Sequence, residues 1–383
     1  MSTETRAPMH APTQSAAASR AEEQREQYYV ASHWVLMRRK FTRHKLAVVS
    51  AVILAVLYFT AVFAGFFSPY DKIRSRTELA FLPPTRVHVF HDGRLQMPFV
   101  YGLAQERDPA TFLLVFSEDR ETRYPIRLFV RGEPYKLWGL IESRIRLFGV
   151  DEPGVVYLFG ADDLGRDVLT RVIHGAQISL SIGLVGIALS FVLGALLGGA
   201  SGLLGGGVDM IIQRIVEFIE AMPGLPLWMA LAAAIPLEWP PVTKYFLMSV
   251  ILSILGWTGL ARTVRGKILQ LREEDFVTAA KVAGTNNLRV ITGHMLPNFV
   301  GYLIVHVTLA IPGMIIGETG LSFLGLGLTS PTVSWGVQLQ QASNVSVIAL
   351  NPWLLIPGLF VFVTVLCYNA VGDGLRDAAD PYK

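Results

Sequence analysis

The stretch Asp275–Pro297, with the sequence DFVTAAKVAGTNNLRVITGHMLP, decides how the whole chain is interpreted. It is a polar, charged helix–turn–helix pattern between two long apolar segments, and in it Ala279 and Ala280 are followed by Gly284. A helix of small residues in a loop of a membrane protein is typically a binding site for a soluble partner. The stretch therefore predicts a membrane subunit whose energy source lies on another chain.

Capping residues indicate where this helix begins and ends. Asp275 can cap a helix that begins at Phe276, and Gly284 suits the left-handed position that follows a helix. Asn286 or Asn287 can cap the next helix. We expect a short helix across the membrane face, with Phe276 as the one large anchor that enters a cleft in a neighbour. The alternative is an amphipathic helix that rests on lipid headgroups.

The composition is that of a membrane protein. Of 383 residues, 52% are hydrophobic and 16% are charged, and the mean hydropathy is +0.44; soluble domains carry about 25% charged residues. The net charge of +3, without a basic stripe that interleaves aromatic residues, argues against a nucleic-acid partner. The single cysteine, Cys367, excludes an intrachain disulfide and a cysteine-based metal cluster.

We predict an all-α polytopic membrane protein with six transmembrane helices, because a hydrocarbon core of about 30 Å needs roughly 20 apolar residues per helix. Charged residues at the start of the third span weaken its prediction. The boundaries of the third and fifth spans are the least certain. The expected spans are 46–67, 178–204, 211–235, 245–264, 296–316 and 353–371.

Lysine and arginine residues set the expected orientation, because cytoplasmic loops carry an excess of them. Basic residues between Arg38 and Lys45 precede the first span and place the N-terminus in the cytoplasm. Six spans return the C-terminus to the same side, and the basic loop 266–295 is cytoplasmic too. Residues 1–45 lack the pattern of a cleavable signal peptide and are expected to form a largely disordered tail.

Residues 68–170 are expected to form an external, periplasmic insert with its own strands. The segment 86–101 alternates around Asp92–Gly93, which is a strong hairpin signal. Segments 112–116, 126–130 and 144–148 also have strand composition. The insert could contact a soluble protein that carries the substrate, or it could be a decoration that covers the outer mouth. Residues 171–383 would then hold the remaining five helices.

The loop around residue 280 resembles the EAA-x3-G-x9-I-x-LP motif of bacterial binding-protein-dependent ABC importer permeases. Thr278 stands where that family has glutamate, and His294 stands at the isoleucine position. The resemblance implies a coupling helix that docks into an ATPase subunit, and the Thr278 departure affects one polar contact. The docking residues that it implies are Asp275, Phe276, Thr278, Ala279, Ala280, Ala283, Gly284, Leu296 and Pro297.

A second match points to a subgroup of that family. The segment 160–167 looks like the GTD-x-x-GRD motif before the second span of the oligopeptide, dipeptide and nickel permeases, with Ala161 and Gln177 as departures. Segments 318–327 and 372–381 are similar to that subgroup as well. The resemblance is to the second, C-type permease subunit, and it does not cover residues 86–150. The candidate residues in the first segment are Gly160, Asp162, Gly165, Arg166 and Asp167.

Physical chemistry suggests a structural role for that segment. Asp163 or Asp167 can cap an interfacial helix, and Arg166 and Arg171 can reach headgroups. The alternative is direct contact with the substrate.

Other polar and small residues in the spans also allow more than one interpretation. Glu217 and Glu220 can snorkel to the membrane surface or pair with Arg214. Glu318 is the better candidate for a residue that lines the pore. The glycines predict close helix packing rather than a phosphate loop. They are Gly183, Gly186, Gly194, Gly198 and Gly199.

The sequence lacks motifs that would make the chain an enzyme. No G-x4-GK[ST] phosphate loop occurs, so the chain is not its own ATPase by that route. No HExxH or GxSxG motif occurs, and the histidines show no ligand spacing. We expect no cofactor on this chain, and the resemblance implies that ATP and Mg are used by partner subunits.

The function that we predict is half of the translocation pore of an ATP-driven importer in the bacterial inner membrane. The resemblance implies a second related permease, two cytoplasmic ATPase subunits and a periplasmic binding protein as partners. It implies peptides as substrate, with nickel complexes or oligosaccharides as alternatives. A secondary transporter or channel would instead predict charges deep inside the spans and pseudo-symmetric halves. A scaffold or sensor is a third possibility.

Overall fold

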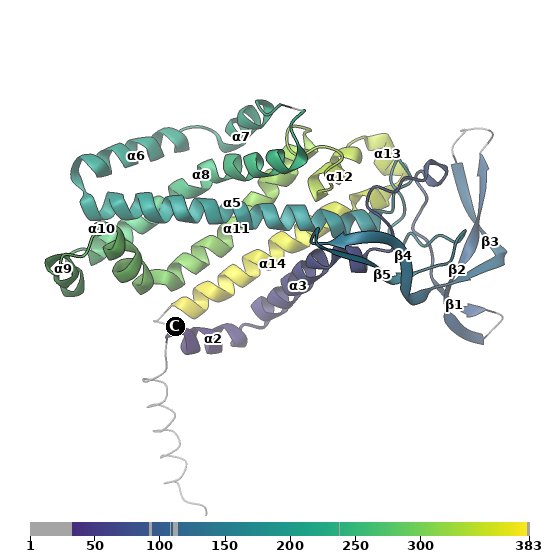
Figure 1. Cartoon of the computed structure of the whole chain (residues 1–383), viewed down its shortest axis with the longest axis horizontal. Coiled ribbons are helices and arrows are strands. Elements are labelled where there is room, and N and C mark those ends of the chain that lie inside the picture. Colours follow the sequence, from purple (N-terminus) through teal and green to yellow (C-terminus); the bar gives the residue numbers. More distant parts are fainter. Residues whose placement is uncertain (1–32, 92–93, 108, 110–113, 237, 381–383) are drawn as a thin grey trace, which may run out of the picture.

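The computed structural model describes residues 33–91, 94–107, 109, 114–236 and 238–380. Long helices lie side by side in a bundle, and β-strands stand at one end of it (Figure 1). At the opposite end of the bundle lie the short helices α9 (Asp275–Val282) and α10 (Asn287–Arg289). The two regions that the sequence singled out are therefore separated by the full length of the bundle.

Among the described residues, five helical segments are long and apolar enough to cross a membrane. Each overlaps one of the predicted spans, so these five predictions are confirmed. The segments are α3 (Lys45–Val62), α5 (Val168–Leu204), α8 (Pro241–Leu271), the run Asn287–Phe323 that ends in α11 (Val300–Phe323), and the run Pro352–Ala379 that ends in α14 (Ile356–Ala379).

The predicted third span, 211–235, is not one continuous helix. It is covered by α6 (Gly206–Glu220) and α7 (Gly224–Ala233), which are bent by 87° at the break between them. Pro223 precedes α7 and has no N–H to continue the hydrogen bonding of α6. The prediction of a single helix is wrong here, and the count of spans reaches six only if this bent pair crosses as a broken helix.

α5 is the central helix of the bundle. Its first turn is capped by Asp167, whose side chain accepts a hydrogen bond from the Thr170 amide, and Gly205 ends it at a φ of 65°. A row of glycines along α5 faces α8, so the two helices approach closely. The prediction that these glycines serve helix packing is confirmed by Gly194 and Gly198, where an added Cβ would meet Leu260 and Ala261 of α8.

Part of the predicted N-terminal tail forms a helix. Residues 1–32 of the expected tail lie outside the described residues, but His33–Arg43 form the helix α2, so the tail prediction is wrong for that segment. Lys40 donates from Nζ to the carbonyl of Asp380 at 2.8 Å, which places α2 against the end of α14 (Figure 1).

The path from α8 to α14 contains several short elements. α9 and α10 are followed by η2 (Val290–Met295) and η3 (Leu296–Phe299), which lead into α11. After α11 come α12 (Trp335–Gln341), α13 (Val345–Leu350) and η4 (Pro352–Leu355). These short elements lie at the two ends of the bundle, with α9 and α10 at one end and α12 and α13 at the other (Figure 1).

The strand-rich insert is confirmed. After α4 (Ala64–Phe67) and η1 (Thr77–Leu79), β1 (His88–His91), β2 (Arg94–Arg107) and β3 (Leu114–Pro125) form one antiparallel sheet. β4 (Arg127–Leu137) and β5 (Ile141–Gly149) form a separate antiparallel ribbon. The predicted hairpin is β1–β2, although its turn residues Asp92 and Gly93 lie outside the described residues.

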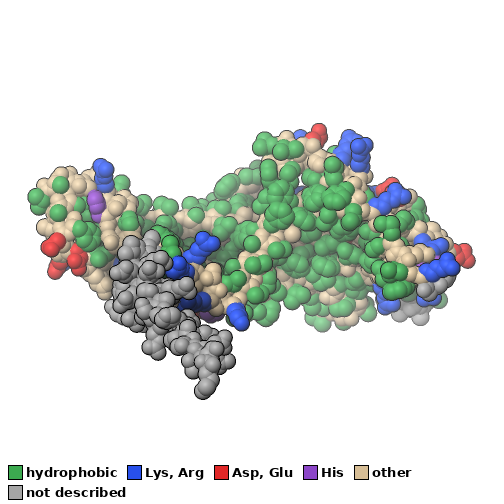
Figure 2. Space-filling view, turned by 90° about the horizontal axis from the view of Figure 1, so that it is seen from below, with side chains coloured by type: hydrophobic (Ala, Val, Ile, Leu, Met, Phe, Trp, Pro, Cys, Tyr) green, Lys and Arg blue, Asp and Glu red, His purple; other side chains and the backbone are tan. Residues whose placement is uncertain are grey.

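The surface agrees with a protein that sits in a bilayer. Hydrophobic side chains cover the middle of the face in Figure 2, whereas charged side chains gather on either side of this band. On α3, Val52 and Val56 are more than half exposed, and a soluble protein rarely exposes so continuous an apolar surface. We therefore interpret this band as the surface that faces lipid.

Candidate functional site: the loop between α8 and α11

α9 is fixed to the bundle by two small apolar side chains. Val277 is fully buried and Ala280 nearly so, and both belong to a cluster with Ile268 of α8 and Ile291 of η2. The three-residue spacing of Val277 and Ala280 puts them on one face of the helix. α9 is therefore seated on the ends of the membrane helices and does not hang in a free loop.

The other face of α9 is exposed and largely apolar. Phe276 is 40% exposed and Val282 is 84% exposed, and Thr278, Ala279 and Ala283 are exposed beside them. Apart from Phe276 these side chains are short, so a neighbouring protein could approach the helix backbone closely. Phe276 is the one large side chain of this face, as predicted, and it is well placed to enter a cleft.

The N-terminus of α9 differs from the prediction. The helix begins at Asp275, and the capping position is Glu274, whose side chain makes no capping hydrogen bond. The prediction that Asp275 caps the helix is therefore wrong. As a first-turn residue, Asp275 instead places a negative charge where the helix dipole is positive.

The C-terminus of α9 is the one predicted. Gly284 has a φ of 79°, its amide donates to the Lys281 carbonyl at 3.0 Å, and the Thr285 amide donates to the Ala280 carbonyl at 3.1 Å. This pair of bonds is the Schellman motif, which satisfies carbonyls at the end of a helix. Asn286 then caps α10, accepting from the Arg289 amide at 2.8 Å.

Leu296 and Pro297 lie in η3, where the loop joins α11. Leu296 packs against the cluster that seats α9, whereas Pro297 is exposed. The structure therefore brings Leu296 together with the underside of α9, and it does not bring Pro297 to the exposed face. Leu296 therefore supports the loop from its far end.

Two ion pairs that the sequence did not reveal connect α6 with α8 beside this loop. Arg265 contacts Asp209 with Nε and a terminal nitrogen, each at 2.6 Å, and Arg262 pairs with Glu220 at 2.6 Å. Glu220 thus differs from Glu217, which pairs with Arg214 as predicted. In the sequence these arginines indicate only the orientation in the membrane. Their acidic partners cannot be identified from it, because they lie more than 40 residues away in the chain.

The segment 160–167 before α5 is a buried structural cluster. Asp162 pairs with Arg166 at 2.7 Å and with Arg171 at 3.3 Å, and both arginines are less than 10% exposed. The prediction that they reach headgroups is wrong, because Asp162 compensates their charge inside the protein.

Asp167 has the capping role that was predicted for it. Its carboxylate accepts from both the amide and the hydroxyl of Thr170, at 2.8 and 2.6 Å. Burial raises the pKa of the Asp167 carboxyl to about 7, although the hydrogen bonds from Thr170 act in the opposite direction. Gly160 and Gly165 have positive φ angles, 76° and 68°, which the turns of this segment require.

Glu318, the candidate for a pore-lining residue, lies inside the helix bundle in this structure. Its side chain has no exposed surface and accepts hydrogen bonds from the hydroxyls of Ser179 at 3.1 Å and Ser322 at 2.9 Å. The amide of Trp335 donates to the same Ser179 hydroxyl. Glu318 therefore holds α5, α11 and the start of α12 together, and the structure gives it a packing role.

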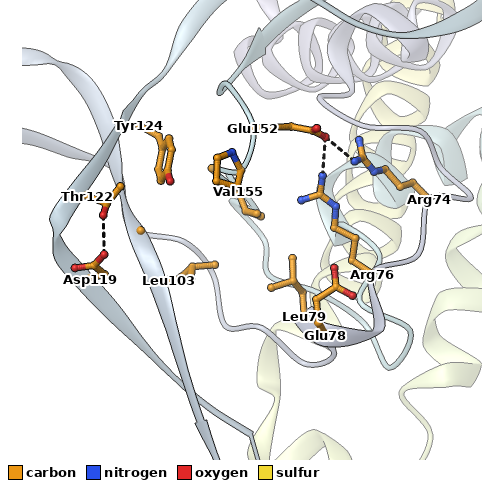
Figure 3. A pocket seen from close by; sticks show the side chains of 13 residues that line it. Arg74, Arg76, Glu78, Leu79, Leu103, Asp119, Thr122, Tyr124, Glu152 and Val155 are labelled. Carbon is orange, nitrogen blue, oxygen red and sulfur yellow. Dashed lines mark hydrogen bonds and ion pairs between the residues drawn. The ribbon is translucent and has the colours of Figure 1, made fainter.

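The open pockets of the insert are lined by both basic and acidic side chains. One of about 540 Å³ lies between the β2–β3 sheet and the chain segments that connect the insert to the bundle. Figure 3 shows Glu152 between Arg74 and Arg76, which it contacts at 2.7 and 3.1 Å. These contacts lower the pKa of Glu152 through the hydrogen bond from Arg74 and through both positive charges. Within the described residues no group of histidine, cysteine or carboxylate side chains could hold a metal ion.

Comparison with known proteins places these features in a family. A family model described as a binding-protein-dependent transport system inner membrane component matches residues 165–382. A second, described as the N-terminal TM domain of oligopeptide transport permease C, matches residues 32–84. Neither match covers β1 to β5, in agreement with the limit of the resemblance found in the sequence.

Individual relatives carry the same description. The chain is 39% identical to the dipeptide transport system permease protein DppC of Bacillus subtilis strain 168, over 60% of this chain and 70% of that protein. It is 38% identical to the oligopeptide transport system permease protein OppC of Haemophilus influenzae, over 59% of this chain and 70% of that protein. A solved structure of the MetNI methionine ABC transporter covers 54% of this chain and 96% of its own, at 15% identity and a TM-score of 0.40, which is too distant for any argument.

The match to the first family model extends over more than half of the 383 residues. The family consists of multi-pass inner-membrane transport subunits, and in such systems ATP hydrolysis belongs to a separate chain, so this chain is not an enzyme. The chain belongs to the binding-protein-dependent inner-membrane permeases and resembles, in its N-terminal helix, the C-type permeases of oligopeptide transport.

Proposed function

We propose that this chain forms half of the translocation pore of an ATP-driven importer and that α9 is its coupling helix. The observation that carries the proposal is the exposed apolar face of α9, anchored by Val277 and Ala280 at the end of the bundle away from the insert. An ATPase subunit that closes around Phe276 would move the ends of α8 and α11 with α9, because one cluster joins them. The family assignment favours this function over a secondary transporter, a channel or a scaffold.

The partners and the topology belong to the same proposal. A second, related permease completes the pore, two cytoplasmic ATPases that use ATP and Mg dock below, and a periplasmic binding protein delivers the substrate. The end with α9 and both termini face the cytoplasm, the insert 68–170 is periplasmic, and α6 with α7 forms a broken sixth span. The basic residues between Arg38 and Lys45, on the α9 side of α3, support this orientation.

We further propose peptides as the substrate class. This substrate class is supported by two relatives, which are named as a dipeptide permease and an oligopeptide permease. Nickel complexes and oligosaccharides remain the alternatives within the same kind of transporter. The binding protein that copurifies with the complex decides between them, since its ligand can be identified directly.

Affinity purification in a gentle detergent tests the assembly. We expect a C-terminally tagged chain to bring down a second permease and one or two ATPases, with measurable ATP hydrolysis. Recovery of this chain as a homo-oligomer without an ATPase, from cells that express all neighbouring proteins, would contradict the proposal.

Substitution of Gly284 tests the docking helix. An added Cβ meets nothing within 4 Å, so Gly284→Val acts through the backbone: a β-branched residue at positive φ costs about 1–2 kcal/mol and distorts the end of α9. We expect loss of substrate uptake and of ATPase copurification, with normal membrane insertion. Gly284→Asn is the matched control, because asparagine tolerates this conformation. Normal uptake by the valine variant would refute the docking role.

A further inference from the structure

Six aromatic rings form a continuous chain between the first membrane helix and the β4–β5 ribbon. Centroids of successive rings lie 4.9 to 6.2 Å apart, within the range of favourable ring pairs. Two rings come from the ribbon and four from α3, α4 and the residue between them. In order of contact they are Phe129, Phe66, Phe67, Phe59, Phe63 and Trp138.

The two residues that the ribbon contributes to this chain of rings have an unfavourable backbone conformation. Phe129 has a φ of 55° and Trp138 a φ of 53°. A bulky residue at positive φ is an outlier, since glycine or asparagine normally occupies such positions. Trp138 lies in the turn that joins β4 to β5, where Gly139 follows with a φ of 74°. Strain that persists at a residue suggests a function for its side chain, and here the side chains are the two rings.

The turn of the ribbon is attached to the end of α3. The indole N–H of Trp138 donates to the carbonyl of Val62 at 3.0 Å, and Val62 is the last residue of α3. Carbonyls at the end of a helix lack a partner within the helix, so the indole satisfies one of them. The ring of Trp138 also lies 5.7 Å from that of Phe63. The turn therefore sits at the depth where the first span ends.

The apolar surface of the turn continues the lipid-facing surface of α3. Trp138 is 57%, Leu140 85% and Ile141 54% exposed. On α3, Val56 and Phe59 are each 55% exposed, and Phe59 belongs to the ring chain. α3 is also the span with the smallest buried share, 22% of its apolar window, as expected of a helix at the edge of the bundle.

Charged side chains flank this apolar turn on the two strands. Lys136 of β4 is the register partner of Glu142 in β5, and Arg144 follows two residues later in β5. All three side chains are exposed. Long basic side chains beside an apolar edge can reach phosphate groups of lipids. Tryptophan is enriched at this level of the bilayer, because its ring is apolar and its N–H is polar. The indole ring of Trp138, the aliphatic side chains of the turn and the basic side chains beside it are together the combination expected at the membrane–water interface.

We propose that the β4–β5 turn, Trp138–Ile141, inserts into the lipid interface around the end of α3 and holds the insert against the membrane. The partner is the bilayer itself, in the leaflet on the side of the insert. The two strained aromatic residues supply the rings, and the indole contact with Val62 fixes the depth of the turn. The proposal is independent of the substrate and of the side of the membrane on which the insert lies.

Spin labels on single cysteines measure this depth. Cys367, the only cysteine, is replaced by alanine, and labels are placed by Leu140→Cys at the turn, Val56→Cys on α3 and Glu121→Cys on the exposed part of β3. The full chain, with the subunits that copurify with it, is reconstituted into vesicles of phosphatidylethanolamine and phosphatidylglycerol. Collisions with oxygen report lipid, and collisions with a water-soluble nickel chelate report solvent.

We expect the label at residue 140 to collide more with oxygen than with the nickel chelate, at a depth between those at residues 56 and 121. A label at residue 140 that behaves like the one at residue 121 places the turn in water and overturns the proposal. Exclusion from both reagents shows that a protein subunit covers the turn, which also overturns it. Leu140 makes no core contact to lose, being 85% exposed, so the variant is expected to fold.

Discussion

Gly198 shows how a single residue determines the spacing of two membrane helices. A Cβ at this position would lie 2.8 Å from the Cα of Ala261, and a backbone atom cannot rotate away. Gly194 and Gly202, one turn to either side, face α8 in the same way. Residues four apart share one face of a helix, so these glycines form a smooth surface on α5. The sequence predicts this use of glycine in general, but not which helix is the neighbour.

We predict that Gly198→Val destabilises the protein by about 1–3 kcal/mol or more, since overpacking forces the two backbones apart. The matched control is Gly259→Val in α8, where an added Cβ meets nothing within 4 Å. Thermal unfolding of the two purified variants in the same detergent measures the difference. Equal midpoints for both would show that the close approach of α5 and α8 is not needed for stability.

Structural elements were easier to predict where one local pattern determines them. The five uninterrupted apolar runs, the β1–β2 hairpin and the glycine at the end of α9 all follow from neighbouring residues in the chain. The sequence does not predict the break between α6 and α7, although Pro223 stands beside it, because the apolar residues on both sides fit one span. Nor does it predict that Arg166 and Arg171 are buried, because their contact with Asp162 depends on the folding of the turns around Gly160 and Gly165.

The ion pairs between the chain segment that precedes the strands and the one that follows them predict a dependence on pH. The pKa of Glu152 is lowered in the folded protein by Arg74 and Arg76. A lowered pKa means that the stabilisation is complete above the unfolded value, about 4.3 for glutamate, and is lost as the pH falls through the folded value. We expect amide protection at Val156 and Tyr157, corrected for intrinsic exchange, to decrease below about pH 5.

Glu152→Gln should remove most of this dependence, because the amide side chain does not titrate. Glu121→Gln on β3 is the control for a general effect of removing a carboxylate from the insert. Unchanged protection of the wild-type protein between pH 7 and pH 4 would show that the ion pairs in Figure 3 do not stabilise the junction.

At the scale of the whole molecule, the two ends of the bundle carry different structural elements. One end holds the short helix α9 with its exposed apolar face, and the other holds the strands (Figure 1). The proposed function requires these two ends to lie on opposite sides of the membrane, with α9 toward the ATPase subunits. This separation gives the proposed orientation a direct test.

We predict that a membrane-impermeant maleimide labels Met97→Cys in intact spheroplasts and labels Gly207→Cys only after the membrane is opened. Met97 is 77% exposed on β2, and Gly207 is exposed in the first turn of α6, near the end that carries α9 (Figure 1). Cys367 is 5% exposed and adds little background. The reverse pattern of labelling would place α9 outside and would contradict its role as the coupling helix.

The sequence by itself determined the kind of protein, five of its apolar spans, the presence of strands in the insert and the glycine that ends α9, in the loop that we propose to be the coupling loop. These features depend on composition and on patterns within about 20 residues, such as span length, alternation and helix ends. Only the tertiary structure decided that Glu318 is buried among serines, that Arg265 pairs with Asp209, and that Trp138 meets the end of α3. The physical reason is that hydrogen bonds, ion pairs and ring contacts need two groups at short range, and the chain brings these groups together across 56 to 139 residues.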